Sequence, residues 1–191
     1  MGVSVLKFKS LILSFMVGSV LFLGCSKDEQ QQPADKTTVA GSTKSINFLN
    51  QYEGLDKQTM WELQQAYAAT ARYQNIANAL KDGYADINVI LQNMGYHYLK
   101  STQLDATFDY RKPEILVYNL DENGQFYLVA VEYAVPLNLS ATAPEGFTGD
   151  DDVWTANTGF GLWLLHAWVW EYNPEGVFNP MNPNVIVTAL L

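Results

Sequence analysis

The sequence predicts an α+β domain in which a long amphipathic helix packs on an antiparallel β-sheet of about four or five strands. Two observations carry this prediction. Apolar residues recur at intervals of three and four between residues 63 and 84, which is the period of a helix. Short runs of β-branched and aromatic residues, separated by turn signals, then follow as far as residue 172.

Residues 1–24 resemble a bacterial lipoprotein signal peptide. Lys7 and Lys9 form a charged start, and the apolar run 11–23 has signal-peptide length but is too short for an ordinary membrane span. The sequence LFLGC at residues 21–25 resembles a lipobox, although Phe22 and Leu23 depart from its commonest form. This resemblance implies that Cys25, the only cysteine of the chain, carries lipid such as palmitate. The alternative is an ordinary cleaved signal peptide with an incidental cysteine.

The segment after Cys25 predicts where the protein lies and how it is attached. Its Lys-Asp-Glu run at residues 27–29 resembles the signal that sends some lipoproteins to the outer face of the outer membrane. A periplasm-facing anchor is the alternative. Residues 25–45, the lipidated cysteine and the polar stretch after it, predict a flexible tether, and residues 46–191 a single α+β domain.

The charge of the chain argues against anionic partners. The formal net charge is −9, with 20 acidic and 11 basic residues. Because the field of such a protein repels phosphates, we expect no nucleic acid and no anionic membrane surface as a partner. The membrane contact that we expect is the lipid anchor.

The helix is predicted to begin near residue 59 and to run for about six turns. Asp56 or Thr59 can cap its start, and Thr59 with Glu62 fits a capping box. Gly83 can take the left-handed position after its last turn. The apolar stripe from residue 63 to residue 84 predicts one face packed on the sheet.

Three later segments predict strands. Residues 96–99 favour a short strand with His97 on one face, and residues 115–120 and 126–135 flank an Asn-Gly turn and predict a β-hairpin. Residues 85–94 fit neither the helical nor the strand period, and residues 137–153 form a long irregular stretch.

The stretch 161–183 contains several of the residues from which we predict a site. Residues 161–172 predict a long strand, on which a period of two places His166, Trp168, Trp170 and Tyr172 on one face. Three Asn-Pro steps then stop strand pairing.

His97, Glu132 and His166 are the candidate ligand-binding and metal-binding residues. The chain lacks a Gly-rich phosphate loop, a nucleophile elbow and a His-Glu-x-x-His motif. Two histidines and one carboxylate suffice for a catalytic zinc or non-haem iron, and a cation would stabilise a carboxylate in the middle of an apolar strand. The alternatives are a polar cluster that lines a pocket without metal, and a structural network in which Glu132 pairs with Arg72, Arg111 or a tyrosine.

The aromatic residues near His166 suggest a second kind of site. Trp168 and Trp170, with Trp154, Trp163 and Tyr172, predict a platform for a sugar ring or another flat ligand. Burial of the same residues in the core is the alternative. The candidate ligands are therefore a glycan, a peptide or a small molecule.

Several segments resemble an uncharacterised family of secreted bacterial proteins. They include MGYHY at residues 94–98, VEY at residues 131–133, and the stretch from HAWVW at residues 166–170 to NPEGVF at residues 173–178. The resemblance spans about residues 60–185 and implies a single exported domain, but no activity. We therefore predict an outer-membrane lipoprotein that binds a ligand, with a metal-dependent enzyme and a structural or interaction protein as the alternatives.

Overall fold

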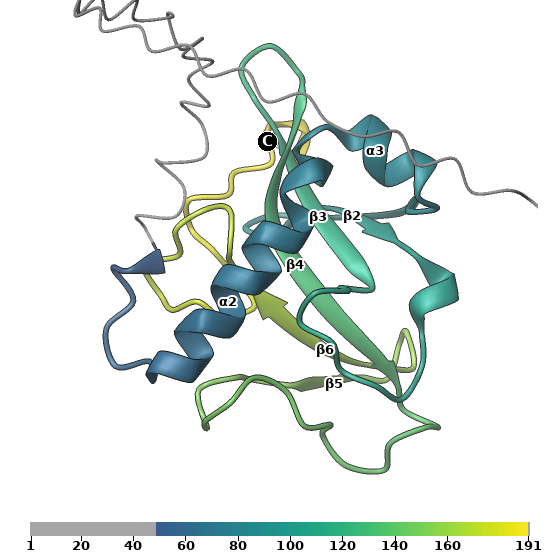
Figure 1. Ribbon diagram of the computed structural model, residues 1–191. Helices are drawn as coiled ribbons and strands as arrows, with labels where there is room; N and C mark the ends of the chain where they lie inside the picture. The colour runs from purple at the N-terminus through teal and green to yellow at the C-terminus, as the bar shows by residue number, and fades with distance from the viewer. Residues whose placement is uncertain (1–48, 191) are drawn as a thin grey trace, which may run out of the picture. The chain divides into compact units, whose positions relative to one another are not determined.

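The computed structural model describes residues 49–190, so the predicted signal peptide, lipobox and tether lie outside the described residues. One antiparallel sheet of six strands has the order β1-β2-β3-β4-β6-β5 and carries helix α2 on one face (Figure 1). An α+β architecture describes this arrangement, with a larger sheet and a shorter helix than the sequence predicts. The strands are β1 (Ala85–Leu91), β2 (Gly95–Leu99), β3 (Ile115–Leu120), β4 (Phe126–Pro136), β5 (Thr155–Asn157) and β6 (Leu162–Ala167).

The predicted six-turn helix is divided into three segments. These are α2 (Lys57–Thr70), the 3₁₀ turn η1 (Ala71–Gln74) and α3 (Ile76–Lys81). The division occurs where the backbone of Asn75 is extended and its side chain accepts a hydrogen bond from the Ala77 N–H at 3.0 Å. Asparagine favours this capping role over a helix interior, so a new helix begins there.

The predicted capping box at the start of α2 is wrong. Asp56 is the cap, and its carboxylate accepts hydrogen bonds from the N–H groups of Gln58 and Thr59 at 2.7 and 2.8 Å. The Glu62 carboxylate instead accepts from the backbone N–H of Thr148 at 2.8 Å, and the Thr59 hydroxyl donates to the Thr148 carbonyl. These two residues therefore fasten the loop after β4 to the helix.

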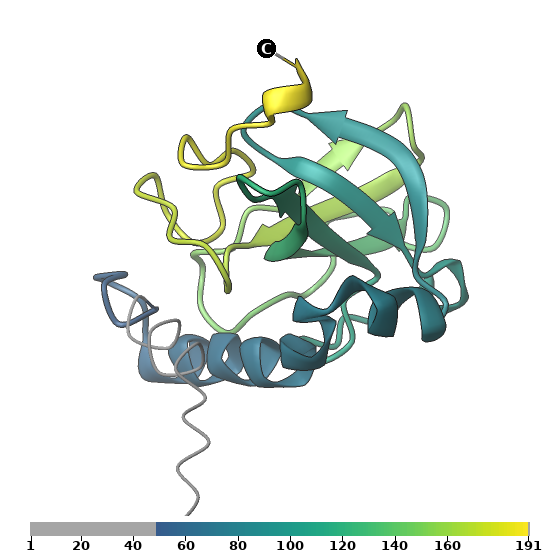
Figure 2. The same cartoon turned by 90° about the horizontal axis from the view of Figure 1, so that it is seen from above.

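The two faces of the sheet bury different sets of residues. Leu63, Ala66 and Tyr67 of α2 pack with the larger core cluster, to which β2, β3, β4 and β6 all contribute. On the other face, Ile115, Val117 and other residues of β3 and β4 pack with Trp168 in a second cluster. In Figure 2, α2 lies along one side of the sheet, and the teal strands β1 and β2 curve away from it.

A β-bulge at Val129 assigns the residues of β4 to these two faces. Val117 pairs with Ala130 and Tyr118 with Leu128, so Val129 has no partner residue on β3. The extra residue reverses the alternation. Leu128 consequently packs on the helix side, whereas Ala130 packs in the second cluster.

The predicted strand 161–172 is too long, because β6 ends at Ala167. The next residue, Trp168, donates its backbone N–H to the Val177 carbonyl at 2.9 Å, and Trp170 donates its own to the carbonyl of the bulged Val129 at 3.2 Å. The chain therefore leaves the ladder, and the strand period no longer applies to the tryptophans. The segment 85–94, which as a whole fits neither period, contains the edge strand β1.

The three Asn-Pro steps share one local structure. In each, the asparagine side-chain oxygen accepts the backbone N–H two residues later, across the proline that has no N–H of its own. The donors are Glu175, Met181 and Asn184, and all three distances are 3.0 Å. These Asx turns hold the irregular segment after β6, which places Val185 in the second cluster.

Glu114, which precedes β3, is a buried carboxyl group outside the pocket described below. It is 5% exposed, and its carboxylate accepts a hydrogen bond from the Ala134 N–H at 2.9 Å. Burial raises its pKa from 4.5 to about 8, and the bond from Ala134 only partly opposes this effect. Ionisation of Glu114 in the folded protein is therefore unfavourable.

We expect Glu114 to lower stability as the pH rises. Folding raises the pKa of this carboxyl group from 4.5 to about 8. Its contribution to the free energy of unfolding is therefore fully present below pH 4.5 and is lost as the pH rises from 4.5 to about 8. In this window the free energy of unfolding of the wild type should fall, relative to that of Glu114→Gln, by about 1 kcal/mol per pH unit. Urea unfolding at several pH values measures the difference. The exposed Glu122→Gln variant is the control, and parallel pH profiles of Glu114→Gln and the wild type would contradict the expectation.

Candidate functional site

The open face of the sheet, opposite α2, contains a pocket of about 570 Å³. Both edge strands contribute to it, with Val89 on β1 and Thr155 on β5, because the sheet curls around it. Most of the wall is apolar, and the polar side chains in it are few. The apolar wall includes Ile87, Leu91, Met94, Leu99, Leu104, Ile115, Val153, Phe160, Leu162, Leu164 and Pro180.

The three candidate residues His97, Glu132 and His166 converge in the wall of this pocket. Glu132 on β4 and His166 on β6 are directly opposite one another in the ladder. His97 lies on β2, two strands from Glu132 and opposite Val117 of the intervening β3. The three side chains are buried, with exposed fractions of 4%, 2% and 5% in chain order.

The two imidazole rings approach the Glu132 carboxyl group from either side. His166 Nδ1 lies 3.3 Å from Oε1, and His97 Nε2 lies 3.8 Å from Oε2. The ring planes are nearly perpendicular, at 89°, with their centroids 6.2 Å apart. One nitrogen or oxygen atom from each residue lies within 4.8 Å of the other two.

An irregularity in β1 orients His97. Asp86 pairs with Tyr98 and Ile90 with Tyr96. Residues 87–89 of β1 therefore lie opposite a single residue of β2, His97. Asn88 in this bulge has a φ of 56°, and the Val89 carbonyl accepts a hydrogen bond from His97 Nδ1–H at 3.0 Å. With the proton on Nδ1, the lone pair of Nε2 is directed toward Glu132.

His166 has a different environment. Its ring is stacked on that of Trp168, with the centroids 6.1 Å apart and the planes inclined by 16°. Its Nε2 atom is buried and has no hydrogen-bond partner within the described part of the chain. An unpartnered polar atom in a buried position is costly, which makes this nitrogen the feature of the site that most needs a ligand.

Burial disfavours charge on all three residues. It raises the pKa of Glu132, and it lowers the pKa of His97 and of His166, on which the neighbouring His97 acts in the same direction. Without a ligand, burial therefore favours the neutral forms of both rings and of the carboxyl group. Arg72, a predicted partner of Glu132, pairs instead with Asp82 at 3.2 Å, and Arg111 donates to Gln65 at 3.0 Å.

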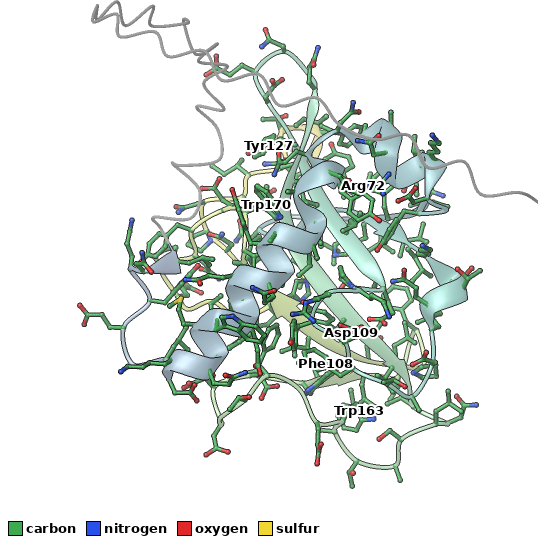
Figure 3. The ribbon with its side chains drawn as sticks, viewed as in Figure 1. Arg72, Phe108, Asp109, Tyr127, Trp163 and Trp170 are labelled. Carbon is green, nitrogen blue, oxygen red and sulfur yellow. The ribbon has the colours of Figure 1, made fainter. Side chains whose placement is uncertain are left out.

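The predicted aromatic platform does not form. Trp168 is fully buried in the second core cluster, and Trp170 stacks on Tyr67 on the helix side of the sheet, with the centroids 3.9 Å apart. Trp163 donates its indole N–H to the Ser140 carbonyl at 3.0 Å, and Figure 3 shows it well separated from Trp170. Because β6 ends before these residues, Trp168 and Trp170 do not line the pocket.

Most of the pocket wall lies outside the residues that the sequence pattern singles out. The alternation of Ile87, Val89 and Leu91 is a strand signal that would have placed these three residues on one face, although the bulge at Asn88 weakens it. Val153 and Phe160 lie outside regular strands. No local periodicity identifies them.

Comparison with protein-family models, with curated proteins and with solved structures finds no match to this chain. None of the helices between residues 49 and 190 combines the length and hydropathy that a membrane span requires.

We expect the bulge that orients His97 to depend on the left-handed backbone of Asn88. Asparagine and glycine tolerate this conformation, whereas a β-branched residue is strained in it. Asn88→Val should lower the free energy of unfolding by about 1–2 kcal/mol, and Asn88→Gly should change it much less. Because Asn88 is exposed, lost packing does not confound the comparison. Equal stabilities in urea unfolding would show that the bulge does not constrain this residue.

Proposed function

We propose that this protein is a lipid-anchored, surface-exposed protein of the bacterial outer membrane that binds a small, mainly apolar molecule. The pocket on the open face of the sheet carries this proposal. Its volume of about 570 Å³ lies within the range of roughly 300–1,000 Å³ that is usual for small-molecule sites. An apolar wall with a few convergent polar groups is the usual composition of such sites.

The distribution of polar groups supports a ligand with one polar end. His97, Glu132 and His166 form a single buried polar cluster, and apolar residues such as Val89 and Leu164 form the wall around it. We infer that the polar end of the ligand interacts with this cluster and that its apolar body contacts the surrounding wall. Burial of that body supplies about 25 cal/mol per Å² of apolar surface.

The opening of the pocket supports the same class of ligand. Leu91, Val153 and Phe160 line the pocket and are also 43%, 52% and 57% exposed. Large apolar side chains at an opening favour the entry of an apolar body. A glycan is less suitable, because Trp168 is buried in the core and Trp170 stacks on Tyr67 on the helix side of the sheet, so neither lines the pocket.

The envelope location rests on the sequence of the N-terminal segment. The LFLGC sequence that ends in Cys25, the Lys-Asp-Glu run after it and the resemblance to secreted bacterial proteins all support it. The formal net charge of −9 supports a role without nucleic acid.

We expect a bulky side chain inside the pocket to abolish binding. Leu164 on β6 lines the pocket, so Leu164→Trp should fill part of it and weaken the binding of a fluorescent fatty acid by tenfold or more. Fluorescence titration of the purified protein measures the affinity. Leu80→Trp is the matched control, because Leu80 is 52% exposed on α3 and does not line the pocket. If a folded Leu164→Trp variant binds the fluorescent fatty acid with wild-type affinity, the fatty acid does not bind in this pocket.

We expect Cys25 to determine where the protein resides. A single acyl chain binds membranes only marginally, and several chains on one residue give stable attachment. The wild type should therefore partition into the detergent phase and incorporate labelled palmitate, whereas Cys25→Ser should do neither. Fractionation of the native host and protease treatment of intact cells measure the location. Detergent partitioning of the Cys25→Ser variant would contradict the lipid anchor.

A further inference from the structure

We infer that His97, Glu132 and His166 bind one first-row divalent transition-metal ion, of the zinc or iron(II) class, in the wall of the pocket. This inference goes beyond the binding of an apolar ligand. It does not depend on that ligand, because all three donor residues belong to the protein itself.

The donor set selects the class of ion. Imidazole nitrogen is a ligand for zinc, copper, iron and nickel, whereas calcium and magnesium prefer shells of oxygen. Two imidazoles and one carboxylate occupy three positions and leave at least one open. Because the same three residues line the pocket, an open coordination position of the metal would face the space in which the ligand binds.

The geometry is close to that of a metal site. Bonds of about 2.0–2.2 Å place tetrahedral ligand atoms roughly 3.4 Å apart. The 3.3 Å from His166 Nδ1 to Oε1 of Glu132 is close to this separation, and the 3.8 Å from His97 Nε2 to the other oxygen, Oε2, is somewhat longer. All three donor atoms lie within 4.8 Å of one another, so small side-chain rotations bring them to bonding distance.

His97 already has the second contact that orients metal-binding histidines. Such a histidine usually donates the N–H of its other ring nitrogen to a carbonyl or carboxylate, which fixes the tautomer and the ring orientation. His97 Nδ1 makes this bond to the Val89 carbonyl at 3.0 Å, which leaves Nε2 as the donor atom toward Glu132. The bulge at Asn88 therefore serves the site.

A hydrogen-bonded structural network accounts less well for the same residues. The 3.8 Å between His97 Nε2 and Glu132 Oε2 is too long for a hydrogen bond, so no direct hydrogen bond links His97 to the carboxyl group. Arg72 and Arg111, the other predicted partners of Glu132, bond elsewhere. A dication would supply the positive charge that a buried Glu132 carboxylate requires.

The test is metal analysis of the full-length protein, purified in mild detergent without a polyhistidine tag or a chelator. The protein is analysed as isolated and after reconstitution with zinc, with iron(II) under anaerobic conditions, and with cobalt(II) as a spectroscopic probe. The variants are Glu132→Gln and the His97→Ala, His166→Ala double substitution, with circular dichroism to verify folding. Glu114→Gln is the matched control, because it removes a buried carboxyl group outside the pocket.

We expect about one metal ion per wild-type chain, a cobalt spectrum typical of nitrogen and oxygen ligands, and the same result for Glu114→Gln. Glu132→Gln should weaken metal binding at least tenfold, and the double variant should bind none. A folded wild type that binds no ion after reconstitution would overturn the inference, whatever the fluorescent fatty acid does. Wild-type metal affinity in the folded double variant would also overturn it. If the wild type binds the metal ion but not the fluorescent fatty acid, only the proposed apolar ligand is rejected.

Discussion

The need to cover both faces of one sheet is the constraint on which this structure depends. Its strands bury apolar side chains on either side, but within residues 49–190 one long helix, α2, covers one face. The other face is covered by the curl of the sheet and by the segment after β6, which contributes Trp168 and Val185. Burial on that side is incomplete, and the space that remains is the pocket. The pocket is therefore a consequence of how the fold buries its second apolar face.

Departures from regular strand geometry position the site within this sheet. At Val129 one extra residue turns Leu128 toward the helix, while Ala130 packs on the face that holds the pocket, the same face as Glu132. The carbonyl of Val129 also accepts the N–H of Trp170, which helps to draw the chain out of the ladder after His166. At Asn88 a second irregularity presents a carbonyl to His97. Bulges commonly redirect side chains near functional sites, and here they do so on both sides of the cluster.

The cluster itself opposes stability. A carboxyl group and two imidazole rings buried in an apolar wall, one of them with an unpartnered nitrogen, cost free energy that hydrophobic residues of similar size would not. Violations of the rules for a stable core are expected where a protein binds or reacts, because there the environment must suit a ligand as well as the fold. Glu114 is also buried, but it lies outside the pocket, and its carboxyl group accepts a hydrogen bond from the Ala134 N–H.

The sequence by itself determined the local features whose causes lie within a few residues: the hairpin around Asn123-Gly124, the strand that carries His97, and Glu132 in the middle of an apolar strand. It also singled out the three residues of the site by their chemistry. The tertiary structure alone decided their convergence, because His97, Glu132 and His166 meet through the strand order β2-β3-β4-β6 and not through any spacing along the chain. It likewise decided the end of β6 and the fate of the tryptophans, since the bonds that end the strand come from Val177 and Val129. A period of two cannot anticipate hydrogen bonds to distant segments.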